Sequence, residues 1–188
     1  MCNTACISFV TDQLKDIPLA GKKILEVGSH NVNGSVSVPL KARKPNVYIG
    51  VDMAPGPGVD MICNVYDIVN FFGPDSFDIV ISTEMMEHVK DWRLAINNMK
   101  MVCKPGGHIL ITTRSKGFPL HGYPEDHWRF EIEDMKKIFE DCQIHKIVSD
   151  WNDIGVLTHV QRSDVYLPGW EAPLEYIKLY NILSDKLE

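Results

Sequence analysis

An apolar run that ends at a glycine limits most strongly what this chain can fold into. Residues 23–27 read Lys-Ile-Leu-Glu-Val, and Gly28 follows directly. Such a run fits a buried strand of a parallel sheet, and the glycine allows the sharp turn by which the chain leaves the sheet. Glu26 then lies near the carboxyl edge, where open α/β sheets bind ligands. We therefore expect a ligand crevice at this edge.

The residues after Gly28 predict a loop that a ligand can approach closely. Pro39 is tolerated in the first turn of a helix but not in its interior, so the next helix should begin between residues 35 and 38. This leaves residues 29–34 as a loop. Asn31 tolerates left-handed backbone angles, and Gly34 allows close approach to the main chain.

Strand and helix patterns alternate along the rest of the chain. Further strands are predicted at 47–52, 59–65, 77–82, 108–113, 144–148 and 156–160, and helices at 5–16, 92–102, 132–139 and 174–187, with a turn at 104–107. With residues 23–27 this makes seven strands. The pattern predicts an α/β, Rossmann-like fold with a mainly parallel seven-stranded sheet and helices on both faces.

Length and composition favour one domain. The 188 residues, 45% of them apolar, suit one core, so we expect a single domain over 1–188, with its core at about 20–160 and terminal helices added at both ends. We find no membrane span or signal peptide and expect a cytoplasmic protein. The five cysteines lack a CxxC pair and are expected to be free thiols. A net charge of -6 makes a nucleic-acid partner unfavourable.

Two carboxylates decide which ligand suits the crevice. A dinucleotide site uses G-x-G-x-x-G, whereas this loop has only Gly28 and Gly34. Glu26 would repel a pyrophosphate but attract an ammonium group. Asp52 ends the second strand and can accept both hydroxyls of a ribose. A ligand with a cationic amino-acid end and a ribose therefore fits better than NAD.

These segments resemble, in order, the motifs of class I S-adenosylmethionine-dependent methyltransferases. The resemblance covers roughly residues 20–150 and rests on residues 25–29, Asp52, 77–80, 84–89 and 104–107. It implies S-adenosylmethionine as cofactor, with its methionine end in the 29–35 loop, its ribose on Asp52 and its adenine at the end of the third strand. The cofactor-binding residues it implies are Glu26, Gly28, Ser29, Asn31, Gly34, Asp52, Met53, Asn64, Val65, Thr83, Glu84 and His88.

Two parts of this assignment have alternatives. Many relatives have aspartate where Asn64 stands; the asparagine carbonyl could still accept a bond from adenine, or the residue could simply form a turn. On a helical turn, Glu84, Glu87 and His88 would share one side and resemble the divalent-metal site of some methyltransferases. The same residues are similar to a pocket-shaping segment of metal-free relatives, and we expect no metal.

The loop over residues 118–130 is where this fold usually faces its substrate. We expect His121, Tyr123 or His127 to lie nearest the methyl acceptor. Alternatively the loop is only anchored, by Trp128, Phe130 and a pair between Arg129 and Glu125 or Asp126. The predicted function is methyl transfer to an oxygen or nitrogen of an unidentified small molecule. The rivals are a cofactor-binding regulatory or scaffold protein and, less favoured, an NAD-dependent oxidoreductase.

The oligomeric state stays open between a monomer and a homodimer. The apolar face of the predicted terminal helix would either cover the sheet edge or form a dimer contact.

Overall fold

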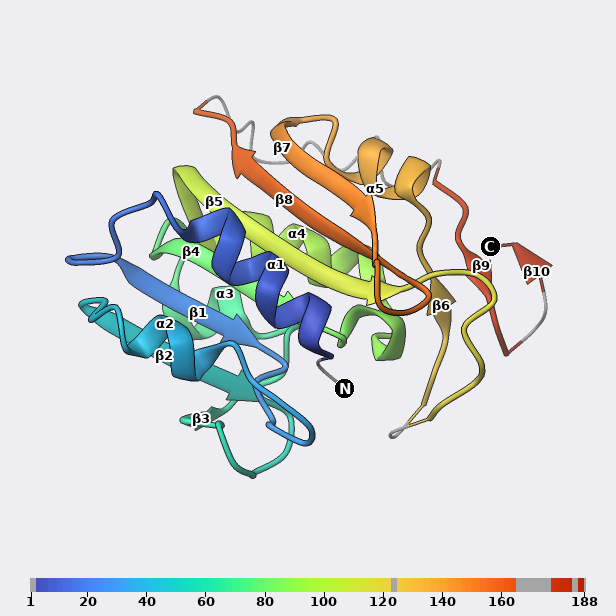
Figure 1. Ribbon diagram of the computed structural model, residues 1–188, viewed down its shortest axis with the longest axis horizontal. Coiled ribbons are helices and arrows are strands. Elements are labelled where there is room, and N and C mark those ends of the chain that lie inside the picture. Colours follow the sequence, from blue (N-terminus) through green and yellow to red (C-terminus); the bar gives the residue numbers. More distant parts are fainter. Residues whose placement is uncertain (1–2, 123–124, 165–176, 184–185, 188) are drawn as a thin grey trace.

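A seven-stranded sheet forms the centre of the protein. The computed structural model describes residues 3–122, 125–164, 177–183 and 186–187. The strand order is β3-β2-β1-β4-β5-β8-β7 (Figure 1), and β8 runs antiparallel to both of its neighbours while the other pairs are parallel. The bounds are β1 Lys23–Val27, β2 Val47–Asp52, β3 Met61–Ile62, β4 Phe77–Thr83, β5 Cys103–Arg114, β7 Cys142–Ser149 and β8 Gly155–Arg162. The predicted fold class is confirmed.

Helices cover both faces because the apolar side chains of the strands alternate between them. The helices are α1 Thr4–Leu14, α2 Ser37–Lys41, α3 Ile68–Phe72, α4 Trp92–Val102 and α5 Ile132–Ile138, with a short 3-10 turn, η1, over Met86–His88. Phe9 and Leu14 of α1 share one buried cluster with Ile24 of β1. Trp92 of α4 packs with Leu25 in the cluster of the opposite face. Figure 1 shows α1 in front of the sheet and α4 behind it.

Three local features differ from the sequence prediction. The third strand shrinks to Met61–Ile62, and the five-residue helix α3, which the sequence did not indicate, follows it. Strand β5 begins already at Cys103, before the predicted turn. The turn survives as an irregularity in that strand, because Phe77 pairs with Cys103 whereas Ile79 pairs with His108, so residues 104–107 loop out of the ladder.

The predicted terminal helix is wrong in the part of residues 174–187 that the structure describes. Residues 180–181 and 186–187 form β9 (Tyr180–Asn181) and β10 (Lys186–Leu187), which make a small antiparallel sheet with β6 (Trp128–Arg129). Ile177 and Leu179 are buried in the core and Lys178 between them is exposed, a period of two that fits an extended chain. This segment therefore covers its own domain. The Val165–Trp170 stretch and Leu174 lie outside the described residues.

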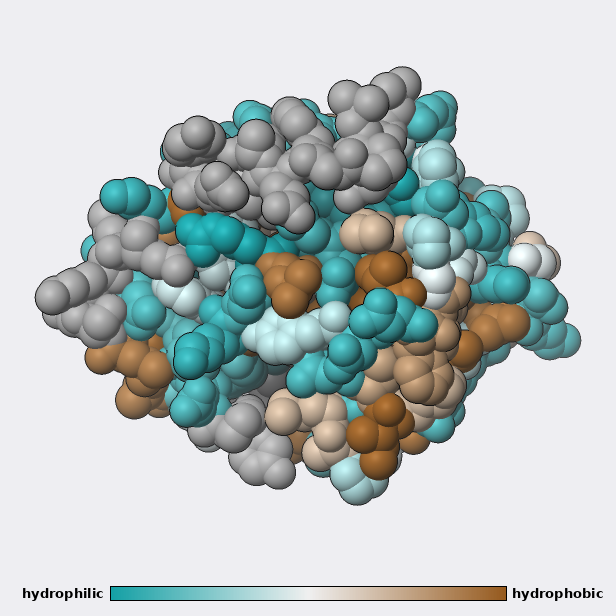
Figure 2. All heavy atoms as spheres, turned by 180° about the vertical axis from the view of Figure 1, so that it is seen from behind, coloured by the Kyte–Doolittle hydropathy of each residue, from teal (hydrophilic) through white to brown (hydrophobic). Residues whose placement is uncertain are grey.

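The surface of the molecule mixes polar and apolar side chains. Figure 2 shows it from behind, with teal and brown spheres interspersed and brown ones most frequent toward the lower right. Large apolar side chains that are more than half exposed include Phe71 and Ile62. No helix within the described ranges is long and apolar enough to cross a membrane.

Candidate cofactor and acceptor site

The ends of β1 and β2 bring two carboxylates together. Glu26 pairs in register with Gly50, and Asp52 lies two residues farther along β2. Paired residues of parallel strands face the same side, as do residues two apart on one strand. Glu26 and Asp52 therefore project to one face at neighbouring strand ends, as the sequence predicts.

Glu26 is a buried acid whose carboxylate binds the hydroxyl of Tyr48. Its exposed fraction is 2%, and its Oε2 accepts a hydrogen bond from the Tyr48 hydroxyl at 2.7 Å. Burial raises the pKa of Glu26 to about 7, although the Tyr48 hydrogen bond and the Lys41 charge act in the opposite direction. A positive charge beside this carboxylate, in addition to Lys41, would lower the pKa of Glu26 and favour its ionised form.

The loop after β1 is held by its own backbone and by the loop after β2. Gly28 has a φ of 78°, and a Cβ at that position would lie 2.8 Å from the Met85 side chain. Both the backbone angle and this close contact therefore require a glycine. Asn31 Oδ1 accepts from Gly34 N at 2.9 Å, and Asn31 N donates to Pro57 O at 2.7 Å. These bonds give the predicted loop a defined shape.

Ser29 lies inside this loop and is 2% exposed. Its Oγ has no hydrogen-bond partner among the described residues. A buried hydroxyl without a partner is costly, so Ser29 is suited to bind a polar group of a ligand.

The end of β2 and the segment after β3 differ in how far their side chains are already engaged. Asp52 accepts weakly from two backbone amides, His30 N at 3.3 Å and Ala54 N at 3.2 Å, and Met53 beside it is 60% exposed. Asn64 Oδ1 accepts from Tyr66 N at 3.1 Å, which is the turn-forming arrangement considered from the sequence. The oxygen proposed for adenine is thus already engaged by a backbone amide.

The neighbouring Val65 is largely covered, at 7% exposure. Its carbonyl accepts from Asn98 Nδ2 at 3.0 Å, which fixes the segment against α4.

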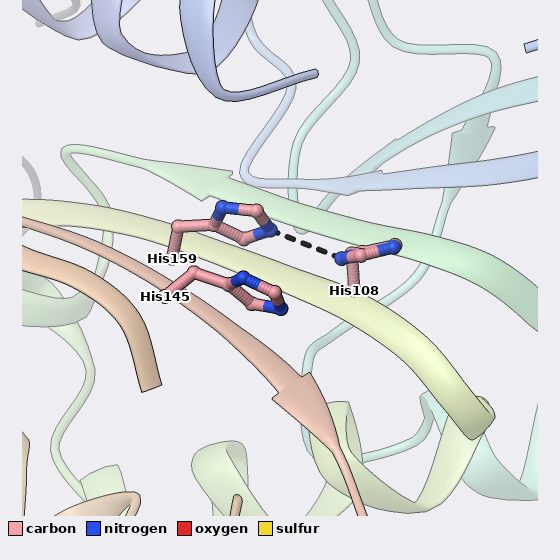
Figure 3. Close-up of side chains that lie close together, drawn as sticks. All are labelled: His108, His145 and His159. Atoms are coloured by element: carbon pink, nitrogen blue, oxygen red, sulfur yellow. Dashed lines mark hydrogen bonds between the residues drawn. The ribbon is translucent and has the colours of Figure 1, made fainter. Parts of the chain in front are cut away.

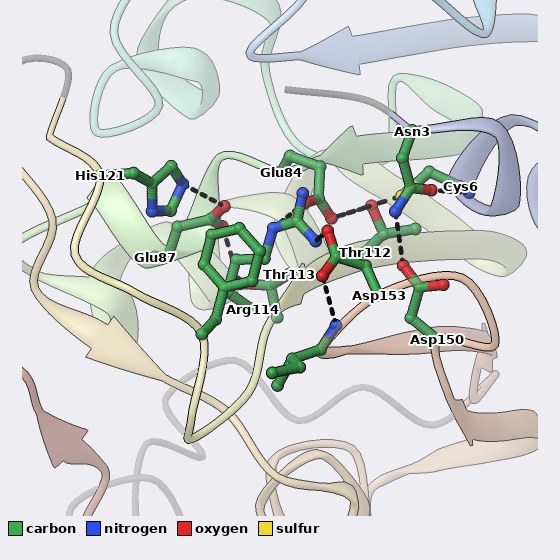
Figure 4. A network of polar contacts seen from close by, with 12 residues as sticks. Asn3, Cys6, Glu84, Glu87, Thr112, Thr113, Arg114, His121, Asp150 and Asp153 are labelled. Carbon is green, nitrogen blue, oxygen red and sulfur yellow. Dashed lines mark hydrogen bonds and ion pairs between the residues drawn. The ribbon is translucent and has the colours of Figure 1, made fainter.

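Glu84, directly after Thr83 at the end of β4, belongs to a network of buried polar groups (Figure 4). Its Oε1 accepts from the Thr112 hydroxyl at 2.9 Å and from the Cys6 thiol at 3.4 Å, and its Oε2 lies 2.5 Å from Arg114 Nε. Burial and the Glu87 carboxylate raise the pKa of Glu84 to about 7, against the charge of Arg114. Both carboxylate oxygens therefore have protein partners.

The backbone at Glu84 has a left-handed conformation, with a φ of 54°. Such a conformation costs a non-glycine residue about 1–2 kcal/mol and is frequent where a functional site fixes the chain.

A second cluster forms where the loop over residues 118–130 returns to η1. Glu87 Oε1 lies 3.8 Å from the Nε2 atoms of both His88 and His121, and the two imidazole rings are 4.9 Å apart. The Thr113 hydroxyl donates to Glu87 Oε2 at 2.8 Å. Among the described residues, Glu87 Oε1 and His121 Nε2 have no hydrogen-bond partner. Both atoms are buried and face each other across 3.8 Å.

His121 is positioned from its other side by an internal ion pair. Its Nδ1 lies 3.0 Å from Asp126 Oδ2, and Arg129 donates to the same Oδ2 at 2.7 Å. The Glu87 carboxylate, followed by Asp126, raises the pKa of His121 against the effect of burial. Trp128 and Phe130 are buried, at 4% and 0% exposure. The anchoring predicted from the sequence is thus confirmed for Asp126, and it places His121 beside Glu87.

Of the other two predicted acceptor-facing residues, the structure describes only His127, whose side chain pairs outside this cluster. His127 Nε2 lies 3.0 Å from Glu125 Oε2, and its backbone amide donates to Glu87 O at 2.8 Å. Tyr123 lies outside the described residues.

The possible metal ligands also differ from the set considered in the sequence. Glu87, His88 and His121 each offer a ligand atom within 4.8 Å of the others, whereas Glu84 pairs with Arg114 instead. The E-x-x-E-H spacing indicated Glu87 and His88, but His121 comes from a loop more than thirty residues away in the sequence. A carboxylate with two imidazoles is a donor set that suits borderline divalent cations.

Comparisons with known proteins agree with this architecture. A family model described as a methyltransferase domain matches residues 3–166. The "Ubiquinone biosynthesis O-methyltransferase" of Vibrio atlanticus is 29% identical over 113 residues, 53% of this chain and 46% of that protein. The chain thus spans about half the length of the curated relatives it matches.

Two solved structures show the same fold. An S-adenosylmethionine dependent methyltransferase from Mesorhizobium loti has a TM-score of 0.62 at 12% identity, over 83% of this chain and 98% of that one. A 1,6-didemethyltoxoflavin-N1-methyltransferase from Burkholderia thailandensis has a TM-score of 0.64 at 11% identity, over 84% and 76%. Since the family model covers most of the sequence, this chain belongs to the methyltransferase-domain family and has the fold of the S-adenosylmethionine-dependent enzymes.

Proposed function

We propose that this chain binds S-adenosylmethionine at the carboxyl edge of its sheet and transfers the methyl group to a small-molecule acceptor. The observation that carries the proposal is the pair Glu26 and Asp52, which project to one face at the ends of adjacent parallel strands within a methyltransferase-family domain. We treat residues 1–188 as a single domain of this kind, with the core at about 20–160.

In this proposal each end of the cofactor meets a different loop. The ammonium group lies near Glu26, the methionine end lies in the 29–35 loop with Ser29 Oγ as a donor or acceptor, and Asp52 accepts the ribose hydroxyls. Met53, Asn64 and Val65 border the adenine. Thr83, Glu84 and His88 shape the pocket wall, with Glu84 acting through its contacts to Thr112 and Arg114.

The chemistry is an in-line displacement that depends mainly on positioning. The acceptor atom forms a bond to the methyl carbon while the carbon–sulfur bond breaks, and the sulfur keeps the electron pair and becomes a neutral thioether. Holding the acceptor, methyl carbon and sulfur in line can contribute about 7–11 kcal/mol. A base is needed only if the acceptor loses a proton.

We propose His121 as that base and a hydroxyl as the acceptor group. Asp126 beside Nδ1 favours the proton on that nitrogen and leaves Nε2 to take the proton of the acceptor. Arg129 holds Asp126, so His121 has a fixed orientation. The O-methyltransferase named among the relatives supports an oxygen acceptor over a nitrogen one.

The decisive experiment measures binding and turnover separately. The purified protein is examined by mass spectrometry for retained cofactor, and isothermal titration then compares S-adenosylmethionine, S-adenosylhomocysteine and NAD. Incubation with labelled methyl donor and panels of phenols, catechols and amines follows. Cofactor binding without product across the panels would favour the regulatory alternative, and binding of NAD alone would refute the proposal.

A further inference from the structure

Three histidines gather on the sheet away from the carboxyl edge. His108 of β5, His145 of β7 and His159 of β8 each offer a nitrogen within 4.8 Å of the others (Figure 3). His108 pairs with Ile79 near the start of β4. Thr112, whose hydroxyl contacts Glu84, pairs instead with Thr83 at the end of β4. Four residues of strand span about 13 Å, so the cluster is separate from the site proposed for methyl transfer.

An irregularity in β7 turns His145 toward this cluster. Ile144 pairs with Val160 and Lys146 with His159, so His145 is an extra residue in the ladder. Such a bulge re-aims side chains and is frequent beside functional sites. The His145 and His159 rings consequently stack, with centroids 4.7 Å apart and planes 16° from parallel.

Hydrogen bonds to two glutamines orient the imidazoles. Gln161 donates through Nε2 to Gly106 O at 2.9 Å, so its Oε1 must accept from His145 Nε2, 3.2 Å away. His145 therefore carries its proton on Nε2 and presents a lone pair on Nδ1. Gln13 Oε1 of α1 likewise lies 3.1 Å from His159 Nδ1 and leaves His159 Nε2 as an acceptor, 3.0 Å from His108 Nδ1.

The geometry points to a binding site for a borderline divalent transition-metal ion, such as Zn²⁺, ligated by His108, His145 and His159. Imidazole nitrogens are the donors such ions prefer, and a bond from the far nitrogen to an amide oxygen is the usual support of a ligating histidine. His108 would move its proton from Nδ1 to Nε2 so that the ion replaces the hydrogen bond to His159. A water would complete a tetrahedral shell.

Protonation and access agree with this assignment. Burial and the neighbouring histidines lower the pKa of His159 to about 3, and burial, with His145 and Lys22, lowers that of His108. His159 is 3% exposed, whereas His145 is exposed and gives the ion a path from solvent. The ion would join β5, β7 and β8, and through Gln13 also α1.

The test is zinc binding to the whole chain by equilibrium dialysis against a competing chelator. Because Glu87, His88 and His121 form a second possible metal group, every measurement is repeated in a His88→Asn background. We expect the wild type and His88→Asn each to bind a zinc ion at the three-histidine site. His145→Asn, which alters an exposed side chain, should weaken this binding at least about 100-fold, and Gln13→Leu about 10-fold.

His30→Asn is the matched control, since His30 belongs to neither histidine group, and it should bind zinc as the wild type does. Equal zinc affinity in wild type, His145→Asn and Gln13→Leu would overturn the assignment, as would a His88→Asn protein that binds no zinc. Methyl transfer by His145→Asn should match the wild type, so failure of the metal site would leave the proposed function untouched.

Discussion

Replacing Glu26 with glutamine tests whether a carboxylate is buried at the end of β1 at the expense of stability. The side chain is 2% exposed, and burial raises its pKa from 4.5 to about 7 despite the Tyr48 hydrogen bond. Glutamine keeps the size of the side chain and an oxygen that can accept from Tyr48, but it never ionises. The variant therefore isolates the cost of charging this position.

The sign and the size follow from proton linkage. The folded protein holds the Glu26 proton more tightly than the unfolded chain does. The contribution of neutral Glu26 to the free energy of unfolding is therefore complete below pH 4.5 and is lost as the pH rises through about 7. At about 1.36 kcal/mol per pH unit, the difference between the two pKa values corresponds to about 3 kcal/mol. Relative to wild type, Glu26→Gln should gain about that much unfolding free energy by about pH 8.5, and much less at about pH 5.

Urea unfolding of cofactor-free protein at these two pH values measures the effect. Glu140→Gln, a substitution of an exposed acid, is the control and should leave the unfolding free energy unchanged at both. The same Glu26→Gln variant should bind S-adenosylmethionine more weakly, because the ammonium group loses its counter-charge. A stability difference between Glu26→Gln and wild type that does not vary with pH would refute the reasoning.

Other substitutions test the remaining parts of the site. Asp52→Ala should weaken cofactor binding in isothermal titration far more than His127→Ala does, and equal affinities would remove Asp52 from the ribose. His121→Asn should lower kcat by about 10²- to 10⁴-fold with little change in cofactor affinity, and the wild-type rate should fall on acidification through a pKa above 6.5, since the base must be neutral. We expect that no metal takes part, so EDTA should leave the rate of methyl transfer unchanged. A rate that is lost with EDTA and restored by Mg²⁺ would contradict this. Gly28→Ala should cost more unfolding free energy than Gly21→Ala, because both have left-handed backbones but only Gly28 adds contact with Met85.

The first two strands were predictable because they are short, mainly apolar runs that end at a glycine or an acid. Residues 23–27 and 47–52 were assigned with the bounds that the structure has. The C-terminal segment was assigned wrongly because Ile177 and Tyr180, three residues apart, also fit a helical pattern, whereas in the structure residues 180–181 pair with β6 as an extended chain. Pairing partners distant in the sequence leave no local signal.

The edge chemistry was predictable only where strand order places it. Glu26 and Asp52 follow from the ends of their strands, whereas the pairing of Glu84 with Arg114 joins two strand ends that lie thirty residues apart. The approach of His121 to Glu87 depends in turn on the pair between Asp126 and Arg129. The sequence contained these residues but not the loop path that brings them together.

The antiparallel position of β8 has a consequence for the order in which the chain folds. Within the part of the chain that the structure describes, β7 pairs in the main sheet only with β8, and β8 joins it to β5. During synthesis β7 therefore has no place in the sheet until residues 155–162 have left the ribosome, and one side of β5 stays unpaired until then. We expect β7 and β8 to form a hairpin first and to dock as a unit, so a chain arrested before Gly155 should aggregate through the open side of β5.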